Sequence, residues 1–149
     1  MSHWAASYVG LPWKADGEGP PPGAACRDPD RTWSFHCWAF VRFVQRRHFG
    51  RELPGIPNPH DLLAMARAFR DHPERRRWTP VEAPAEGDCA LMRQARYPIH
   101  VGVWIEAEPL SRGGGVLHCI RGSGVVFQRL DALALHGWRV EGFYRFQDA

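Results

Sequence analysis

The second half of the chain restricts the fold most, because it is a succession of short strand-like stretches separated by turn residues. The clearest stretch covers residues 99–105, in which aliphatic residues occupy every second position and so share one face of a strand. Gly122 and Ser123 form a glycine-first pair that suits a tight hairpin between two such stretches. The other predicted strands cover residues 78–81, 88–92, 116–121, 124–128 and 138–146.

The first half has helical character instead. Apolar residues recur at helical spacing from Cys37 to about Phe49, and Gly50 is placed to cap the end of that helix. A short helix is expected over residues 2–9, and another over about 59–72. Helices followed by a meandering antiparallel sheet define an α+β fold. The length of 149 residues suits a single domain that spans residues 1–149.

Charge and composition narrow the functional classes. The net charge of +3, with histidines neutral, is too small to indicate nucleic acid or a membrane surface as a partner. The sequence opens with no signal-peptide pattern, and no apolar stretch approaches the roughly 20 residues that span a bilayer, so we expect a protein made in the cytoplasm. Its four cysteines are then expected to be free thiols. Cys26 lies in a loop predicted over residues 14–29, and its role stays open.

Cys37 has the clearest chemical potential, because it falls at the predicted start of the central helix. The unpaired amide hydrogens and partial positive charge of a helix N-terminus favour an anion. We therefore expect the pKa of this thiol to be lowered and its thiolate to be populated. A thiolate nucleophile still needs a base and a group that orients the base.

Two histidines of the predicted sheet can supply these groups. His100 lies mid-strand on the face opposite the aliphatic one, and Gly102 on the same face is expected to leave open space beside it. His118 lies on the next predicted strand, and consecutive strands tend to be neighbours, so it can hydrogen-bond the His100 ring. A lone strand histidine is more often a core or surface residue. The order Cys37, His100, His118 is what favours a nucleophile, a base and an orienting group.

Six short segments occur in a fixed order along the chain. They are YVGLPW at 8–13, HCWAFV at 36–41, FGRELP at 49–54, EGD at 86–88, IHVGVW at 99–104 and VLH at 116–118. Taken together, these segments resemble the NlpC family of papain-like cysteine peptidases. That family combines Asp-Cys-(Ser/Trp)-Gly-(Leu/Phe)-Val, a later His-Val-Gly-(Ile/Val), and a polar third residue, commonly His, on the next strand. Each short motif is weak alone, but the ordered combination covers nearly the whole chain and is fairly specific.

The resemblance implies a papain-like fold and a cell-wall hydrolase that cuts amide bonds in peptidoglycan stem peptides, often between D-glutamate and diaminopimelate. Cys37 would be the nucleophile, His100 the general base and then acid, and His118 the orienting residue, with the Cys37 N–H helping to stabilise the oxyanion. Compact members of this kind occur in tailed phages and prophages. This implies a place in the tail tip with other tail-tip proteins as partners, and action in the periplasm. No metal and no cofactor is expected.

Three positions depart from the family pattern. His36 stands where an aspartate could cap the helix, and a histidine is not expected to cap it in the same way. Ala39 replaces the usual glycine, and Trp13 stands where a tyrosine near the oxyanion is usual. Trp13, His36 and Trp38 are the candidate substrate-binding or oxyanion residues, with core packing as the alternative for Trp38.

Two other interpretations stay open. The pairs His36–Cys37 and His118–Cys119 contain zinc-binding residue types, although their spacing does not match common zinc motifs and adjacent strand residues face opposite ways. Alternatively, the protein keeps the fold but binds rather than cuts, as a catalytically silent tail-tip adaptor. In that case the long loop and the tryptophans would serve binding.

Overall fold

The structure, a computed structural model, describes residues 3–20, 28–55, 76–94, 97–106 and 113–147. Within these residues, helices pack on one antiparallel sheet, so the fold is α+β as expected. The helix predicted over 59–72 and the loop cysteine Cys26 lie outside the described residues. The strands are β1 (Trp78–Val81), β2 (Cys89–Gln94), β3 (Tyr97–Ile105), β4 (Gly115–Ile120), β5 (Gly124–Gln128) and β6 (Trp138–Phe146).

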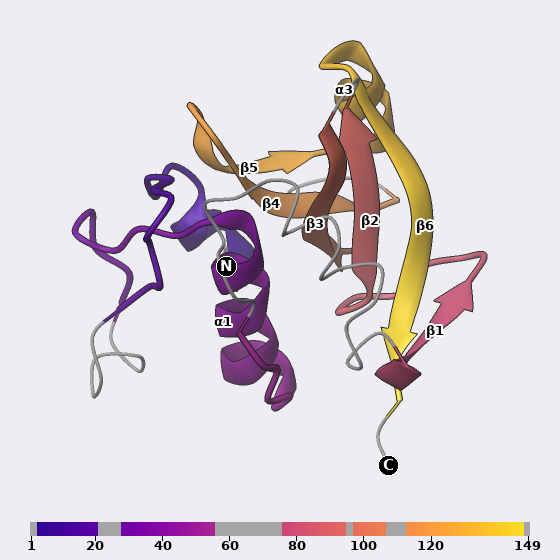
Figure 1. Ribbon diagram of the computed structural model, residues 1–149, viewed down its shortest axis with the longest axis horizontal. Helices are drawn as coiled ribbons and strands as arrows, with labels where there is room; N and C mark the ends of the chain where they lie inside the picture. The colour runs from indigo at the N-terminus through magenta and orange to yellow at the C-terminus, as the bar shows by residue number, and fades with distance from the viewer. Residues whose placement is uncertain (1–2, 21–27, 56–75, 95–96, 107–112, 148–149) are drawn as a thin grey trace.

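The sheet departs from a simple meander at its last strand. Strands β2 to β5 follow one another, but β6 returns across the sheet to lie between β1 and β2. A buried carboxylate secures this return, because Asp88 accepts hydrogen bonds of 3.1 and 2.9 Å from the Arg145 guanidinium on β6. Figure 1 shows β2 and β6 upright with β4 and β5 lying nearly across them, so the sheet is strongly twisted.

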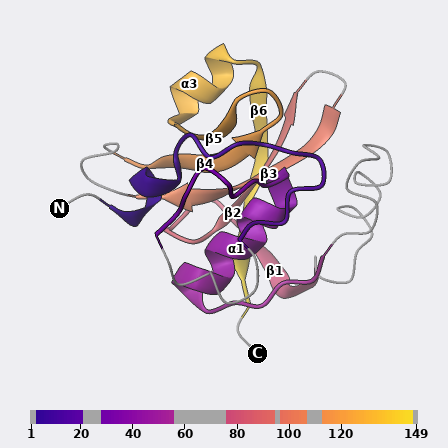
Figure 2. The same cartoon turned by 90° about the vertical axis from the view of Figure 1, so that its left-hand side faces the viewer.

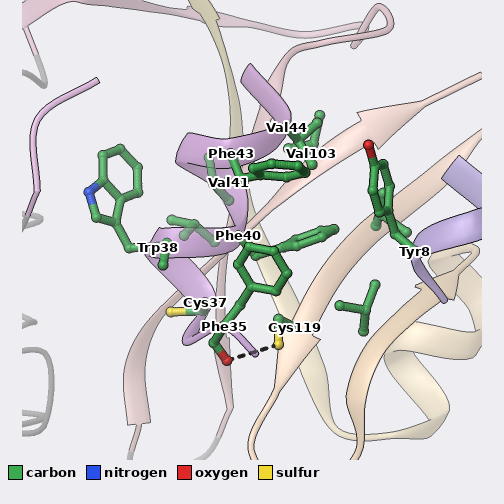
Figure 3. Packing of buried hydrophobic residues seen from close by; sticks show 14 of the residues in the cluster. Tyr8, Phe35, Cys37, Trp38, Phe40, Val41, Phe43, Val44, Val103 and Cys119 are labelled. Atoms are coloured by element: carbon green, nitrogen blue, oxygen red, sulfur yellow. Dashed lines mark hydrogen bonds between the residues drawn. The ribbon is translucent and has the colours of Figure 1, made fainter. Parts of the chain in front are cut away.

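The central helix α1 (Cys37–Phe49) has the predicted bounds and lies against β3 and β4 (Figure 2). Gly50 ends the helix in the left-handed conformation, with φ of 67°, and its N–H donates to the Gln45 carbonyl. In Figure 3 the rings of Tyr8, Phe35, Phe40 and Phe43 pack against one another beside the helix, and Phe40 has no exposed surface. We call the side of the sheet covered by α1 the α1 face. It carries Val101, Val103, Ile105, Leu117 and Cys119.

A second cluster covers the opposite side of the sheet, which we call the α3 face. Its cover is the six-residue helix α3 (Leu130–Leu135), which the sequence analysis missed. Leu133 is buried there with Met92 and Trp104. At the N-terminus, a 3₁₀ helix (Trp4–Tyr8) falls within the predicted range. The sheet therefore has two covered faces with different side chains on each.

The hairpin between β4 and β5 differs from the predicted two-residue turn. Ile120 is opposite Gly124, so three residues form the loop. The N-terminal segment explains this register, because Val125 donates to the Leu11 carbonyl and accepts from the Gly10 N–H, both at 2.8 Å. A Cβ at position 124 would lie 2.3 Å from that same Leu11 carbonyl oxygen, so only glycine fits there.

Candidate active site

His100 on β3 and His118 on β4 lie side by side on the α3 face. His100 Nε2 and His118 Nδ1 are 2.8 Å apart, which is the hydrogen bond expected from adjacent strands. Both residues are buried, with 7% of His100 and 0% of His118 exposed. The two imidazoles are thus held in one fixed relation.

Gly102 makes this approach of β4 to β3 possible. A Cβ at this position would lie 2.4 Å from Val116 Cγ1 and 2.9 Å from the His118 Cβ. The expected open space beside His100 is therefore wrong, because Val116 and His118 occupy it. The missing side chain is used for close packing of two strands rather than for access.

The environment of the two imidazoles keeps them neutral. Burial lowers the pKa of His100 well below its usual value, and the neighbouring His118 lowers it further. Burial also lowers the pKa of His118 to about 4, although a hydrogen bond to Gln128 acts in the opposite direction. The Trp138 ring stacks on His100 with ring centroids 4.6 Å apart, which adds to this burial.

Cys37 lies at the first turn of α1 as predicted, but the predicted lowering of its pKa is wrong. The backbone N–H groups of Val101, Trp38 and Cys37 itself do lie against the thiol and lower its pKa. Burial acts more strongly and raises the pKa of Cys37 to about 11, because only 7% of the residue is exposed. The helix N-terminus therefore favours the thiolate without populating it in the resting protein.

The sheet opens where Cys37 approaches it. The Trp104 backbone N–H donates to the Asp88 backbone carbonyl, beside β2, at 2.8 Å. Backbone groups alternate along a strand, so Val103 and Val101 direct theirs toward β4. The pairing of β3 with β4 extends only to Val103 opposite Leu117, which leaves the Val101 N–H to the Cys37 thiol. The Val101 N–H, which belongs to the peptide bond that joins His100 to Val101, is therefore near enough to the sulfur to lower its pKa. Among the described residues, no hydrogen bond joins this thiol to either imidazole.

A second thiol lies in the same cluster but has a different role. The Cys119 thiol donates to the Phe35 carbonyl at 3.3 Å, and Figure 3 shows the Cys37 sulfur pointing away from it. Burial raises the pKa of Cys119, and it raises the pKa of Cys89 to about 12. Of the three described thiols, Cys37 has the least raised pKa.

His36 caps α1, and it does so through a ring nitrogen rather than a carboxylate oxygen. Its Nδ1 accepts a hydrogen bond from the Ala39 N–H at 3.3 Å, because an unprotonated ring nitrogen can take the place of a carboxylate oxygen. Its proton is then on Nε2, which donates to Glu18 Oε1 at 2.9 Å. Glu18, whose side chain is 59% exposed, thereby places a carboxylate next to the capping residue.

The two candidate tryptophans have different surroundings. The Trp38 indole N–H donates to the Pro54 carbonyl at 2.8 Å within the core, which agrees with the core-packing alternative. Trp13 is half-buried beside Phe35, and the Arg121 guanidinium lies 5.7 Å from its ring. Sequence reasoning missed two other residues, Trp138 above His100 and Gln128 beside His118, because both depend on strand order and register.

The structure also bears on the alternative site types. Among the described residues, no group of three or more His, Cys, Asp or Glu side chains is placed to hold a metal ion. His118 and Cys119 lie on opposite faces of the sheet, as their adjacency on a strand predicts. In the same part of the chain, no helix is long and apolar enough to cross a membrane.

No protein-family model matches the chain, and no curated protein is significantly similar to it.

Proposed function

We propose that the protein is a papain-like cysteine peptidase of the NlpC type that hydrolyses amide bonds in peptidoglycan stem peptides. The observation that carries this proposal is the 2.8 Å hydrogen bond between His100 and His118, together with the Cys37 thiol at the His100–Val101 peptide. Nucleophile, base and orienting group come from a helix start and two adjacent strands, which is the arrangement such catalysis needs. The substrate class rests on the resemblance of the sequence segments to that family, as does a place in a phage tail tip.

The proposed reaction uses His100 twice. Cys37 Sγ attacks the substrate carbonyl carbon while His100 takes the thiol proton, and the resulting imidazolium then protonates the leaving amine. Water hydrolyses the thioester with His100 again acting as base. The Cys37 N–H would donate to the oxyanion that forms during attack.

The pKa shifts define the starting state of this reaction. With the pKa of Cys37 at about 11 and that of His100 well below its usual value, the resting site holds a neutral thiol and a neutral imidazole. Proton transfer then accompanies attack rather than preceding it. The three N–H groups around the sulfur stabilise its charge as it develops.

A catalytically silent adaptor is the second candidate function. The burial of Cys37 and its raised pKa favour this alternative, because both reduce the reactivity of the thiol. The two functions differ in whether defined muropeptides are cleaved.

Mass spectrometry of muropeptides digested with the protein separates these candidates. We expect new amine-bearing fragments with the parent and none with Cys37→Ala. Cys119→Ala is the matched control, because it removes a buried thiol of the same cluster that is not at the His100–Val101 peptide. If Cys37→Ala cleaves as well as the parent, the peptidase assignment is wrong. If neither cleaves any muropeptide, the adaptor is favoured.

A further inference from the structure

The polar contacts on the α3 face continue past the histidine pair. His118 Nε2 lies 2.8 Å from Gln128 Oε1 on β5. Gln128 Nε2 lies 3.2 Å from His136 Nδ1, just beyond α3, and that nitrogen also lies 2.8 Å from the Ala132 carbonyl. A chain of side chains therefore runs from the buried His100 to the exposed end of α3.

Hydrogen-bond directions along this chain locate the protons. A neutral imidazole carries one N–H, and an amide oxygen only accepts. His118 must therefore carry its proton on Nε2 to bond Gln128 Oε1, which leaves His118 Nδ1 as an acceptor. That acceptor requires the His100 proton to be on Nε2, since the two atoms are 2.8 Å apart. His100 Nδ1 then has a lone pair.

We propose that Gln128 is a positioning residue whose amide oxygen, acting through His118, holds the His100 proton on Nε2 and keeps Nδ1 free as the base for Cys37. This inference rests on the proposed function for its catalytic meaning. Its structural basis is the diagonal placement of Gln128 and His118 on β5 and β4, where Gln128 lies opposite Val116 and shares its face.

The opposite orientation of the amide shows why this residue matters. If the NH₂ group faced His118 Nε2, each proton in the chain would reverse, and His100 would carry its proton on Nδ1. That nitrogen could then not accept a proton from a thiol. His136, at the exposed end of these hydrogen-bonded side chains, is compatible with both orientations of the Gln128 amide. Its Nδ1 can either accept from Gln128 or donate to the Ala132 carbonyl. In the orientation present, the oxygen faces His118, which corresponds to the active arrangement.

The test compares two substitutions that differ in hydrogen-bonding ability. Gln128→Glu has only acceptor oxygens and should keep the His100 Nε2–H tautomer, as read from ring ¹⁵N NMR. Gln128→Met has only a weak thioether acceptor in place of the amide oxygen and should give mixed tautomers. It should also lower kcat roughly 10- to 100-fold with KM within about twofold, a smaller loss than for a residue that contacts the base directly. The carboxylate of Gln128→Glu should also move the acidic limb of the pH–rate profile to higher pH, because negative charge stabilises the imidazolium.

Gln94→Met is the matched control. The Gln94 side chain donates to the His136 carbonyl at 2.8 Å, so it contacts the same end of the chain without reaching His118. This variant should leave the tautomer and the pH–rate profile unchanged.

Two results would overturn the inference. One is a parent protein with the His100 proton on Nδ1, and the other is Gln128→Met with the same tautomer as the parent. If Gln128→Met does not fold, an unshifted imidazole titration in Gln128→Glu would overturn it equally. A parent that cleaves nothing would contradict the proposed function, while the tautomer comparison would still decide the role of Gln128.

Discussion

Different interactions hold the functional side chains on the two faces of the sheet. On the α1 face, side chains such as Phe40 and Val103 are held by close packing, and the Cys37 thiol is embedded among them. On the α3 face, His100 and His118 are held by directed hydrogen bonds that fix the positions of protons. Packing tolerates apolar exchange, whereas a proton arrangement fails when one partner is lost. The proposed site lies at the His100–Val101 peptide of β3, where Val101 points to the α1 face and His100 points to the α3 face.

The largest expected effect comes from substitutions that remove a side chain from one face of the sheet and leave the other face intact. His100→Ala should lower kcat/KM roughly 10⁵-fold or more, with His118→Ala less damaging, because an orienting group usually matters less than the base. Phe40→Ala on the α1 face should instead lower the free energy of unfolding by about 3–5 kcal/mol and leave kcat nearly unchanged in folded protein. Urea unfolding and muropeptide kinetics measure the two quantities. Equal losses of activity in both variants would remove the distinction between the faces.

The second effect in size is a loss of folding stability at acid pH, which arises from the histidines of the α3 face. The pKa of His118 is about 4 in the folded protein, against an ordinary 6.5, so between these values the unfolded chain binds a proton that the folded chain does not. The contribution of His118 to the free energy of unfolding is then complete above pH 6.5, and about 3 kcal/mol of it is lost as the pH drops to 4. His100, whose pKa is also lowered, adds to the loss. Urea unfolding at several pH values measures it, and His118→Gln should flatten the dependence. A stability that stays constant from pH 7 to pH 4.5 would contradict this assignment.

A smaller effect is expected where β3 and β4 touch. Gly102→Ala places a methyl group against Val116 and the His118 Cβ, so it should cost about 1–3 kcal/mol of stability and also displace one imidazole from the other. Loss of kcat beyond the loss of folded protein is the expected signature. Gly55→Ala serves as control, because its new methyl group would meet only the flexible end of the Arg42 side chain. If both variants retain full activity, close approach at Gly102 does not position His118.

Much of the α1 face was predictable from the sequence. The helical spacing of apolar residues and Gly50 gave the bounds of α1, and alternation placed His100 opposite the aliphatic residues. The raised pKa of Cys37 was not predictable, since it depends on how deeply the helix start is buried in the folded chain. The helix α3 has only six residues and no side-chain cap at Arg129, so it leaves little local signal.

The position of Gln128 on the α3 face depends on the register of β5 against β4. A two-residue turn at Gly122 and Ser123 would place Gln128 opposite Leu117, on the α1 face. The three-residue loop places it opposite Val116 instead, on the same face as His118. A shift of one residue moves every side chain of a strand to the other face. The N-terminal segment that pairs with Val125 sets this register, and no local pattern in the hairpin reports that contact.

The rate at which each thiol is alkylated tests most directly whether the two faces act together. Iodoacetamide labelling at neutral pH, located by peptide mass spectrometry, needs no substrate. Burial raises the pKa of Cys89 more than that of Cys37, so Cys37 should react faster on thiolate content alone. A neighbouring imidazole base should increase this difference in rate further, and His100→Ala should remove the increase. Equally slow labelling of Cys37, Cys89 and Cys119, unchanged in His100→Ala, would contradict the account.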